Sequence, residues 1–83
     1  MEILDFYADW CGPCQMMKPV MEEFAAAHPE IKVTPVNIDE EEELAEKYSV
    51  TNIPCVVFLK DGEEIKREVG VQSVKKLEKL AEV

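Results

Sequence analysis

Two cysteines separated by two residues are the clearest source of chemistry in this sequence. They stand in the run Trp10-Cys11-Gly12-Pro13-Cys14, directly after a short apolar stretch that is typical of a β-strand. Cysteines three residues apart at the start of a helix can close a small disulfide ring, and the helix N-terminus stabilises a thiolate on the first one. We therefore interpret Cys11 as the candidate nucleophile and Cys14, one turn deeper, as the thiol that resolves a mixed disulfide.

A zinc site or a pair of inert buried thiols is the alternative interpretation of the cysteine pair. Zinc would need two further ligands, and the remaining candidates, Cys55 and His28, form no second closely spaced pair. We therefore expect no metal and no cofactor beyond the redox-active Cys11–Cys14 disulfide. Cys55 follows a proline and is either a small buried hydrophobe or a third thiol near the pair, and we favour the buried interpretation.

Composition and charge restrict the function further. The chain has 83 residues, of which 47% are hydrophobic, and this is enough for a single domain spanning residues 1–83. Nine basic against 18 acidic residues give a net charge of −9, which argues against nucleic-acid binding. No apolar run is long enough to cross a membrane, and Met1 is followed by acidic Glu2 and not by a basic leader. We expect a soluble, cytoplasmic monomer that binds no membrane.

The order of apolar patterns predicts an α/β fold. Strands are expected at residues 3–8, 31–38, 55–59 and 64–69, and helices at residues 12–28, 40–48 and from residue 74 onward. A strand–helix–strand connection is parallel and right-handed by default, and Asp61-Gly62 predicts a tight hairpin turn. We therefore expect three layers, α/β/α, in which three helices cover both faces of a four-stranded mixed sheet.

Four local signals refine this arrangement. Pro19 removes a backbone hydrogen bond from the first helix and is expected to kink it. Pro35 removes a donor from the second strand, which should therefore lie at an edge of the sheet. Asp39 with Glu42 three residues later predicts a capping box for the second helix. Ser73 is expected to cap the last helix.

Taken together, these motifs resemble the thioredoxin family. The matching segments are Asp5 to Cys14, Pro19, Val36 to Asp39, Ile53-Pro54, Asp61-Gly62 and Val69-Gly70. The resemblance implies a thioredoxin-like fold, a cis peptide bond before Pro54 that faces the cysteine pair, and reduction of protein disulfides with electrons from a thioredoxin reductase or an equivalent donor. The substrate-binding residues that it implies are Trp10, Gly12, Pro13, Ile53, Pro54 and Gly70.

The sequence departs from the family pattern at several places. The usual first strand and helix are missing, which gives a glutaredoxin-sized chain and leaves the strand with Pro35 as an edge. Pro35 stands where the family usually carries a lysine beside a buried aspartate, and Cys55 stands where threonine is common. Burial should raise the pKa of that aspartate, Asp5, and make it the candidate proton acceptor for Cys14.

Two alternative functions are kept beside a protein-disulfide reductase that serves electron transport and cell redox homeostasis. The length is compatible with a glutathione-dependent oxidoreductase of the glutaredoxin type. Gly70-Val71 and Asn52-Ile53-Pro54, however, replace the Gly-Gly and Thr-Val-Pro that are usual there. The other alternative is a non-enzymatic thioredoxin-fold binding module or metal carrier that uses Cys55.

Overall fold

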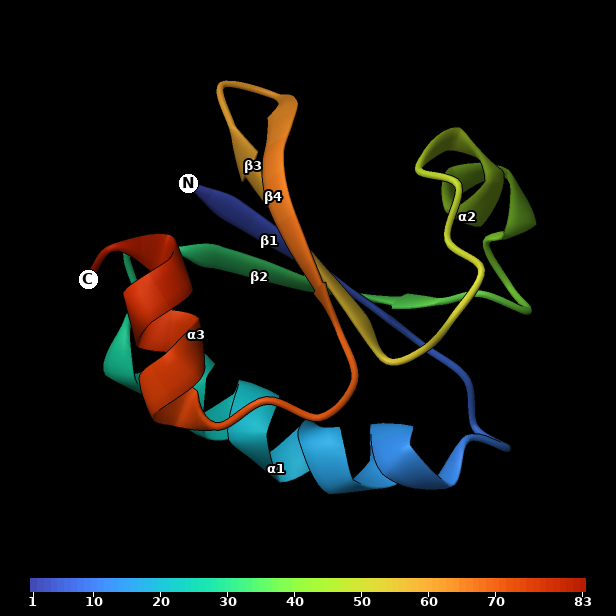
Figure 1. Ribbon diagram of the computed structural model, residues 1–83, viewed down its shortest axis with the longest axis horizontal. Coiled ribbons are helices and arrows are strands. Elements are labelled where there is room, and N and C mark those ends of the chain that lie inside the picture. The colour runs from blue at the N-terminus through green and yellow to red at the C-terminus, as the bar shows by residue number, and fades with distance from the viewer.

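A four-stranded mixed sheet forms the centre of the computed structural model, which describes all 83 residues (Figure 1). The strands are β1 (Glu2–Tyr7), β2 (Lys32–Asn37), β3 (Cys55–Lys60) and β4 (Glu63–Val69). They lie in the order β2-β1-β3-β4. β1 is parallel to β2 and antiparallel to β3, and β3 is antiparallel to β4. The predicted mixed sheet is confirmed, and β2 with its proline lies at an edge as expected.

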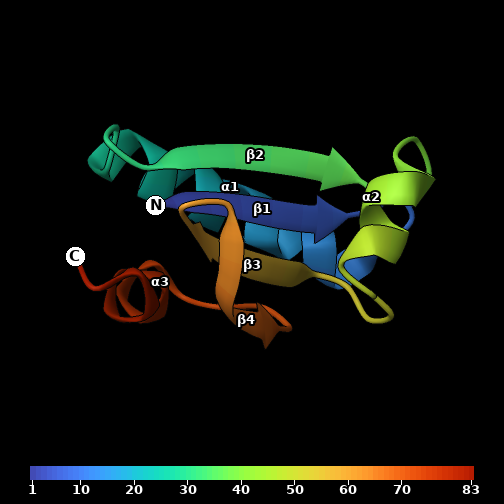
Figure 2. The same cartoon turned by 90° about the horizontal axis from the view of Figure 1, so that it is seen from above.

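Three helices complete the three predicted layers. They are α1 (Gly12–Ala27), α2 (Glu42–Lys47) and α3 (Val74–Ala81). α1 and α3 lie together under one face of the sheet, and α2 lies by the end of the sheet to which β1 and β2 run (Figures 1 and 2). α1 runs through Pro19 as one helix of 16 residues. No helix has the length and apolar character needed to cross a bilayer.

The sheet is buried on both faces because residues along β1 and β3 alternate between two apolar clusters. The cluster against α1 and α3 consists of Ile3, Met17, Met21, Phe24, Ile31, Val56, Phe58, Leu77 and Ala81. The cluster on the other face, which Leu44, Ala45 and Tyr48 cover, consists of Leu4, Phe6, Val36, Cys55, Val57 and Leu59. The lack of alternation in the sequence of β1 therefore reflects its central position between two cores.

The hairpin and the last helix begin as their sequences predict. Asp61 and Gly62 both have positive φ angles, of 54° and 83°, as the expected two-residue hairpin turn requires. At the start of α3 the Ser73 Oγ accepts a hydrogen bond of 3.1 Å from the Lys76 backbone N–H. These local signals were readable from sequence because they depend only on neighbouring residues.

The capping box predicted at Asp39 is wrong. α2 begins at Glu42, after Glu41, and no side chain caps it. The chain instead forms a turn in which the backbone N–H groups of Glu40 and Glu41 donate to the Asn37 carbonyl oxygen. The Asp39 carboxylate accepts a hydrogen bond from Trp10, 29 residues earlier, and Asp39 lies two residues before the N-cap position of α2, which Glu41 occupies.

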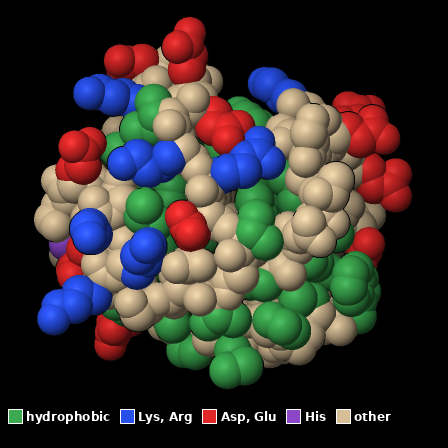
Figure 3. Space-filling model, viewed as in Figure 1, with side chains coloured by type: hydrophobic (Ala, Val, Ile, Leu, Met, Phe, Trp, Pro, Cys, Tyr) green, Lys and Arg blue, Asp and Glu red, His purple; other side chains and the backbone are tan.

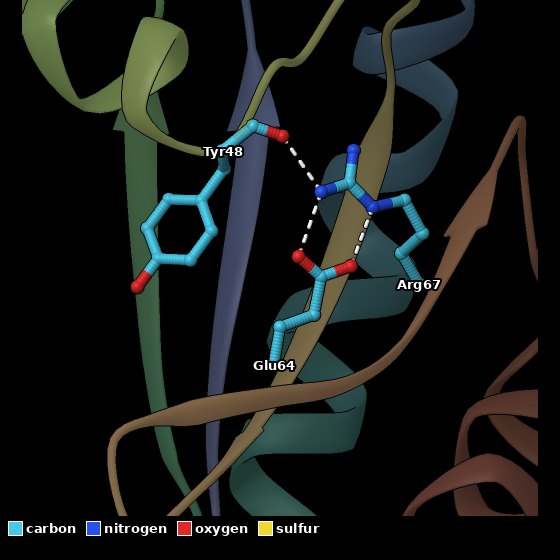
Figure 4. Close-up of polar contacts among 3 residues, drawn as sticks. All are labelled: Tyr48, Glu64 and Arg67. Atoms are coloured by element: carbon cyan, nitrogen blue, oxygen red, sulfur yellow. Dashed lines mark hydrogen bonds and ion pairs between the residues drawn. The ribbon is translucent and has the colours of Figure 1, made fainter.

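An arginine joins β4 to the end of α2 (Figure 4). The Arg67 guanidinium donates two hydrogen bonds to Glu64, from Nε at 2.6 Å and from Nη2 at 2.7 Å. Nη2 also donates at 2.6 Å to the carbonyl oxygen of Tyr48, the residue that ends α2. A helix of six residues is too short to be stable alone, so this contact helps to hold α2 on the sheet.

We expect Arg67→Met to lower the free energy of unfolding by about 1 to 2 kcal/mol, because methionine keeps an apolar stem and loses three hydrogen bonds. Urea unfolding measures this change, and hydrogen exchange should show faster opening of residues 44–48. Lys60→Met, which removes an exposed cation at the end of β3, is the matched control. Equal unfolding free energies for the two variants would contradict a tie between β4 and α2.

Candidate active site

The cysteine pair lies where β1 ends and α1 begins. Cys11 is the N-cap residue of α1, and its sulfur accepts a hydrogen bond of 3.2 Å from the backbone N–H of Cys14. A disulfide joins the two residues, whose Cα atoms are 5.2 Å apart. Pro13 lies in the first turn of the helix, where its missing N–H leaves no hydrogen bond unmade. The helix start therefore places one sulfur at a positive dipole end and the other within bonding distance.

The loop before β3 passes directly over this pair. The peptide bond between Ile53 and Pro54 is cis, as the family resemblance implies. The Ile53 carbonyl oxygen lies 3.9 Å from the sulfur of Cys11. The Pro54 carbonyl oxygen accepts a hydrogen bond of 2.8 Å from the Gly70 N–H, which ties this loop to the one after β4. Residues from three separate parts of the chain thus meet around Cys11.

Trp10 stands beside the pair and points its indole toward α2. Its side chain is exposed, and its Nε1 donates a hydrogen bond of 2.8 Å to Asp39. The turn that carries Asp39 is held in place by a second hydrogen bond, from the Asp39 N–H to the Asn37 side chain at 2.9 Å. The sequence does not indicate this partner of Trp10, because the spacing of Asp39 and Glu42 predicts a helix cap instead.

Apolar side chains surround the exposed side of the pair. Figure 3 shows them gathered at the end of the molecule where α1 begins, with acidic side chains on the neighbouring region around α2. Large exposed apolar residues include Trp10 next to Cys11, Met16 in α1, and Val69 and Val71 on either side of Gly70. The segment after Gly70 is fixed to α1, because the Gln72 N–H lies 3.2 Å from the sulfur of Met17. An exposed apolar surface with backbone groups at its centre is suited to binding an extended peptide segment.

Asp5 lies beneath the pair, on the face of β1 that is covered by α1. The residue is 8% exposed, and its Oδ1 has no hydrogen-bond partner. Burial raises the pKa of this carboxyl from 3.8 to about 6. Asp5 and Cys14 line the same cavity of about 220 Å³, which has room for several water molecules. The carboxyl of Asp5 and the side chain of Cys14 therefore border a common space.

Cys55 belongs to a different environment. It is 1% exposed and packs in the cluster with Phe6 and Val57, on the face of β3 turned toward α2. Burial is the main cause of the raised pKa of this thiol. Cys11 and Cys14 form a separate cluster with Ala8. No group of three or more His, Cys, Asp or Glu side chains is arranged to hold a metal ion.

The largest cavity of the molecule does not contain this chemistry. It measures about 760 Å³ and is lined by Leu44, Lys47 and the acidic residues 39–43. No cysteine borders it. The smaller cavity at Asp5 is chemically the more informative one, because the redox-active Cys14 and a carboxyl with a raised pKa both line it.

Comparisons with known proteins agree with this geometry. The Thioredoxin family model matches residues 1–82. The thioredoxin of Chlamydia trachomatis is 45% identical over 78 residues, which cover 94% of this chain and 76% of that protein. The thioredoxin of Alicyclobacillus acidocaldarius is 42% identical and matches 98% of this chain and 79% of its own length.

Solved structures give the same result. The thioredoxin of Fasciola hepatica superposes with a TM-score of 0.91 at 42% identity, covering 98% of this chain and 77% of that one. Oxidised mitochondrial thioredoxin 3 of Saccharomyces cerevisiae gives a TM-score of 0.89 at 36% identity, covering 98% of this chain and 76% of its own. The chain, with its disulfide-forming Cys11 and Cys14, therefore belongs to the thioredoxin family of protein thiol–disulfide oxidoreductases.

Proposed function

We propose that the protein works as a reductant of protein disulfides and that Cys11 is its attacking sulfur. The observation that carries this proposal is the hydrogen bond from the Cys14 N–H to the Cys11 sulfur at the positive end of α1. In the reduced protein the same N–H and the helix dipole would stabilise negative charge on that sulfur, which favours its reaction as a thiolate.

The reaction proceeds in two exchanges. The Cys11 thiolate attacks one sulfur of a substrate disulfide, forms a mixed disulfide with it and releases the other substrate sulfur as a thiolate. Cys14 then attacks the Cys11 sulfur, which closes the internal disulfide and releases the second substrate sulfur. Two electrons have passed to the substrate. A thioredoxin reductase or an equivalent donor must return two electrons to the Cys11–Cys14 disulfide.

Substrate binding is assigned to the residues around the pair. In this proposal the exposed residues Trp10, Gly12 and Pro13 form one side, and the half-buried Ile53 and Gly70 with the backbone of the buried Pro54 form the other. An extended substrate segment would pair with the backbone beside the Ile53 carbonyl oxygen, which lies against Cys11. Backbone pairing depends little on side chains, so the range of substrate proteins is broad.

Asp5 is the proton acceptor for Cys14 in this scheme. Cys14 must lose its proton to attack, and the carboxyl of Asp5 borders the same cavity. A pKa of about 6 leaves this carboxyl mostly ionised at pH 7 and yet close enough to neutrality to accept a proton transiently. The lack of a hydrogen-bond partner for Oδ1 leaves an acceptor atom free.

The setting of this activity follows from its chemistry. A dithiol reductant works where thiols are kept reduced, so we place the protein in the cytoplasm, serving electron transport and redox homeostasis. We further propose that the 83 residues act as one domain and as a monomer, because the surface around Cys11 has to remain free for substrates. No cofactor is needed beyond the cysteine pair.

Replacement of the two cysteines separates their roles. Cys14→Ser should accumulate a stable mixed disulfide between Cys11 and one sulfur of the attacked insulin disulfide, because the second exchange is blocked. Cys11→Ser should form none and should lose insulin reduction. Mass spectrometry and non-reducing gels with insulin as substrate measure both outcomes. Turnover of insulin by Cys11→Ser, or turnover of the wild type only with glutathione as donor, would contradict the proposal.

We expect Cys55→Val to keep the rate of insulin reduction within about twofold, because the side chain is of similar size and the site is apolar. The free energy of unfolding should change by less than about 1.5 kcal/mol. A folded variant that has lost activity would assign a function to this third thiol.

Asp5→Asn should slow insulin reduction at pH 7 by at least about tenfold, since the amide cannot accept the Cys14 proton. The deficit should shrink above pH 9, where the thiol ionises without help. Initial rates from pH 5 to 10 measure the profile. An unchanged profile would remove Asp5 from the mechanism.

The same variant should be more stable at neutral pH. The pKa of the Asp5 carboxyl rises from 3.8 to about 6 on folding. Above pH 6, where the carboxyl is ionised in both the folded and the unfolded state, this shift lowers the free energy of unfolding by about 3 kcal/mol. Below pH 3.8 the carboxyl is neutral in both states and costs nothing. Asp5→Asn should therefore gain up to about 3 kcal/mol at pH 7.5 and nothing at pH 3.5, as urea unfolding at the two pH values will show.

A further inference from the structure

A single lysine borders the space around Asp5. Asp5 faces two cavities, of about 220 and 240 Å³. Three residues line both of them, namely Asp5, Lys18 and Pro35. Lys18 is the one basic residue that lines either cavity, and it takes part in no ion pair with another side chain.

The helix explains why Lys18 lies there. Lys18 follows Cys14 by four residues in α1, so the two side chains lie one turn apart on the same face of the helix. Across the cavity, Asp5 stands on β1, and its partner in the neighbouring strand is Pro35. Proline offers neither a charge nor a backbone N–H to the carboxylate. Between β2 and α1, only α1 can therefore supply a positive charge that stabilises the Asp5 carboxylate.

None of the other ionisable groups around Asp5 is basic. They are Cys14 and Glu22 from α1, Tyr7 and Asp9 from the end of β1, and Cys55 from β3, whereas β2 contributes no ionisable side chain to either cavity. Asp9 and Glu22 are themselves acidic, and a carboxylate nearby disfavours a second one. Lys18 is the one positively charged side chain among the residues that line the two cavities.

We propose that Lys18 is a positioning residue for proton transfer from Cys14 to Asp5, holding the carboxylate in its ionised, proton-accepting form and orienting water in the shared cavity. This inference rests on the proposed function. When Cys14 attacks the mixed disulfide, its proton passes to Asp5 and the Cys14–Cys11 bond forms. The bond from Cys11 to the substrate sulfur breaks, and that sulfur leaves as a thiolate with the electron pair of the broken bond. Lys18 neither gains nor loses a proton in this step.

The test compares Lys18→Met with Lys18→Arg and with Lys75→Met. Lys75 is an exposed residue of α3 that lines neither cavity, so its replacement removes the same charge elsewhere. Methionine is a good helix former, and Lys18 is itself exposed, so the variants are expected to fold. The Asp5 carboxyl is titrated by carbon NMR in each oxidised protein, and insulin reduction is followed from pH 5 to 9.

Lys18→Met should move the Asp5 titration midpoint upward by at least about half a pH unit. The pH at which insulin reduction slows on acidification should rise by the same amount, so the reaction at pH 6 should be about two- to threefold slower than in the wild type. Lys18→Arg should restore both, and Lys75→Met should match the wild type. If the Asp5 titration midpoint were the same in Lys18→Met and in Lys75→Met, the role of Lys18 would be overturned. The NMR titration requires no catalytic turnover, so it tests Lys18 even if the proposed function is wrong. The proposed function is tested separately: if the rate of Asp5→Asn still falls at acid pH as the wild-type rate does, Asp5 is not the proton acceptor.

Discussion

The hydrogen bond from the Cys14 backbone to the Cys11 sulfur is the contact on which the site depends. It exists because β1 ends just before Cys11 and α1 starts just after it, so that Cys11 takes the N-cap position and its sulfur the place of a capping oxygen. One local geometry thus fixes the distance between the two sulfurs and supplies the positive charge that stabilises a thiolate. The three-layer fold keeps this helix start in place by burying α1 against the sheet.

The surroundings of the pair come from distant parts of the chain and are fastened to one another. The cis peptide loop at Pro54 is joined to the loop at Gly70, the segment after Gly70 is joined to α1 through Met17, and Trp10 is joined to the turn at Asp39. Each contact holds a surface element that would otherwise be a free loop. The apolar binding face is therefore a product of tertiary packing, although every residue in it is visible in the sequence.

Beneath this face the molecule carries an unfavourable feature. Asp5 is a buried carboxyl with an unpartnered oxygen, and the neighbouring strand offers it only a proline. Such a group lowers stability whenever it is ionised, and a domain of this size has little stability to lose. A carboxyl that would be costly in a purely structural core is useful where a thiol must give up a proton. The cavities lined by Lys18 connect this interior group with the surface.

The sequence by itself determined the element order, the hairpin at Asp61-Gly62, the cap at Ser73 and the cysteine pair, because these features depend on residues that are neighbours along the chain. Family resemblance added the cis bond before Pro54, which spacing and periodicity could not have indicated. Only the tertiary structure decided that Asp39 binds Trp10 instead of capping α2, that Cys55, which the sequence predicts to be buried, packs on the face of β3 turned toward α2, and that Lys18 borders Asp5. Those outcomes depend on which of several partners a side chain meets once the sheet has formed, and local propensity holds no information about that choice.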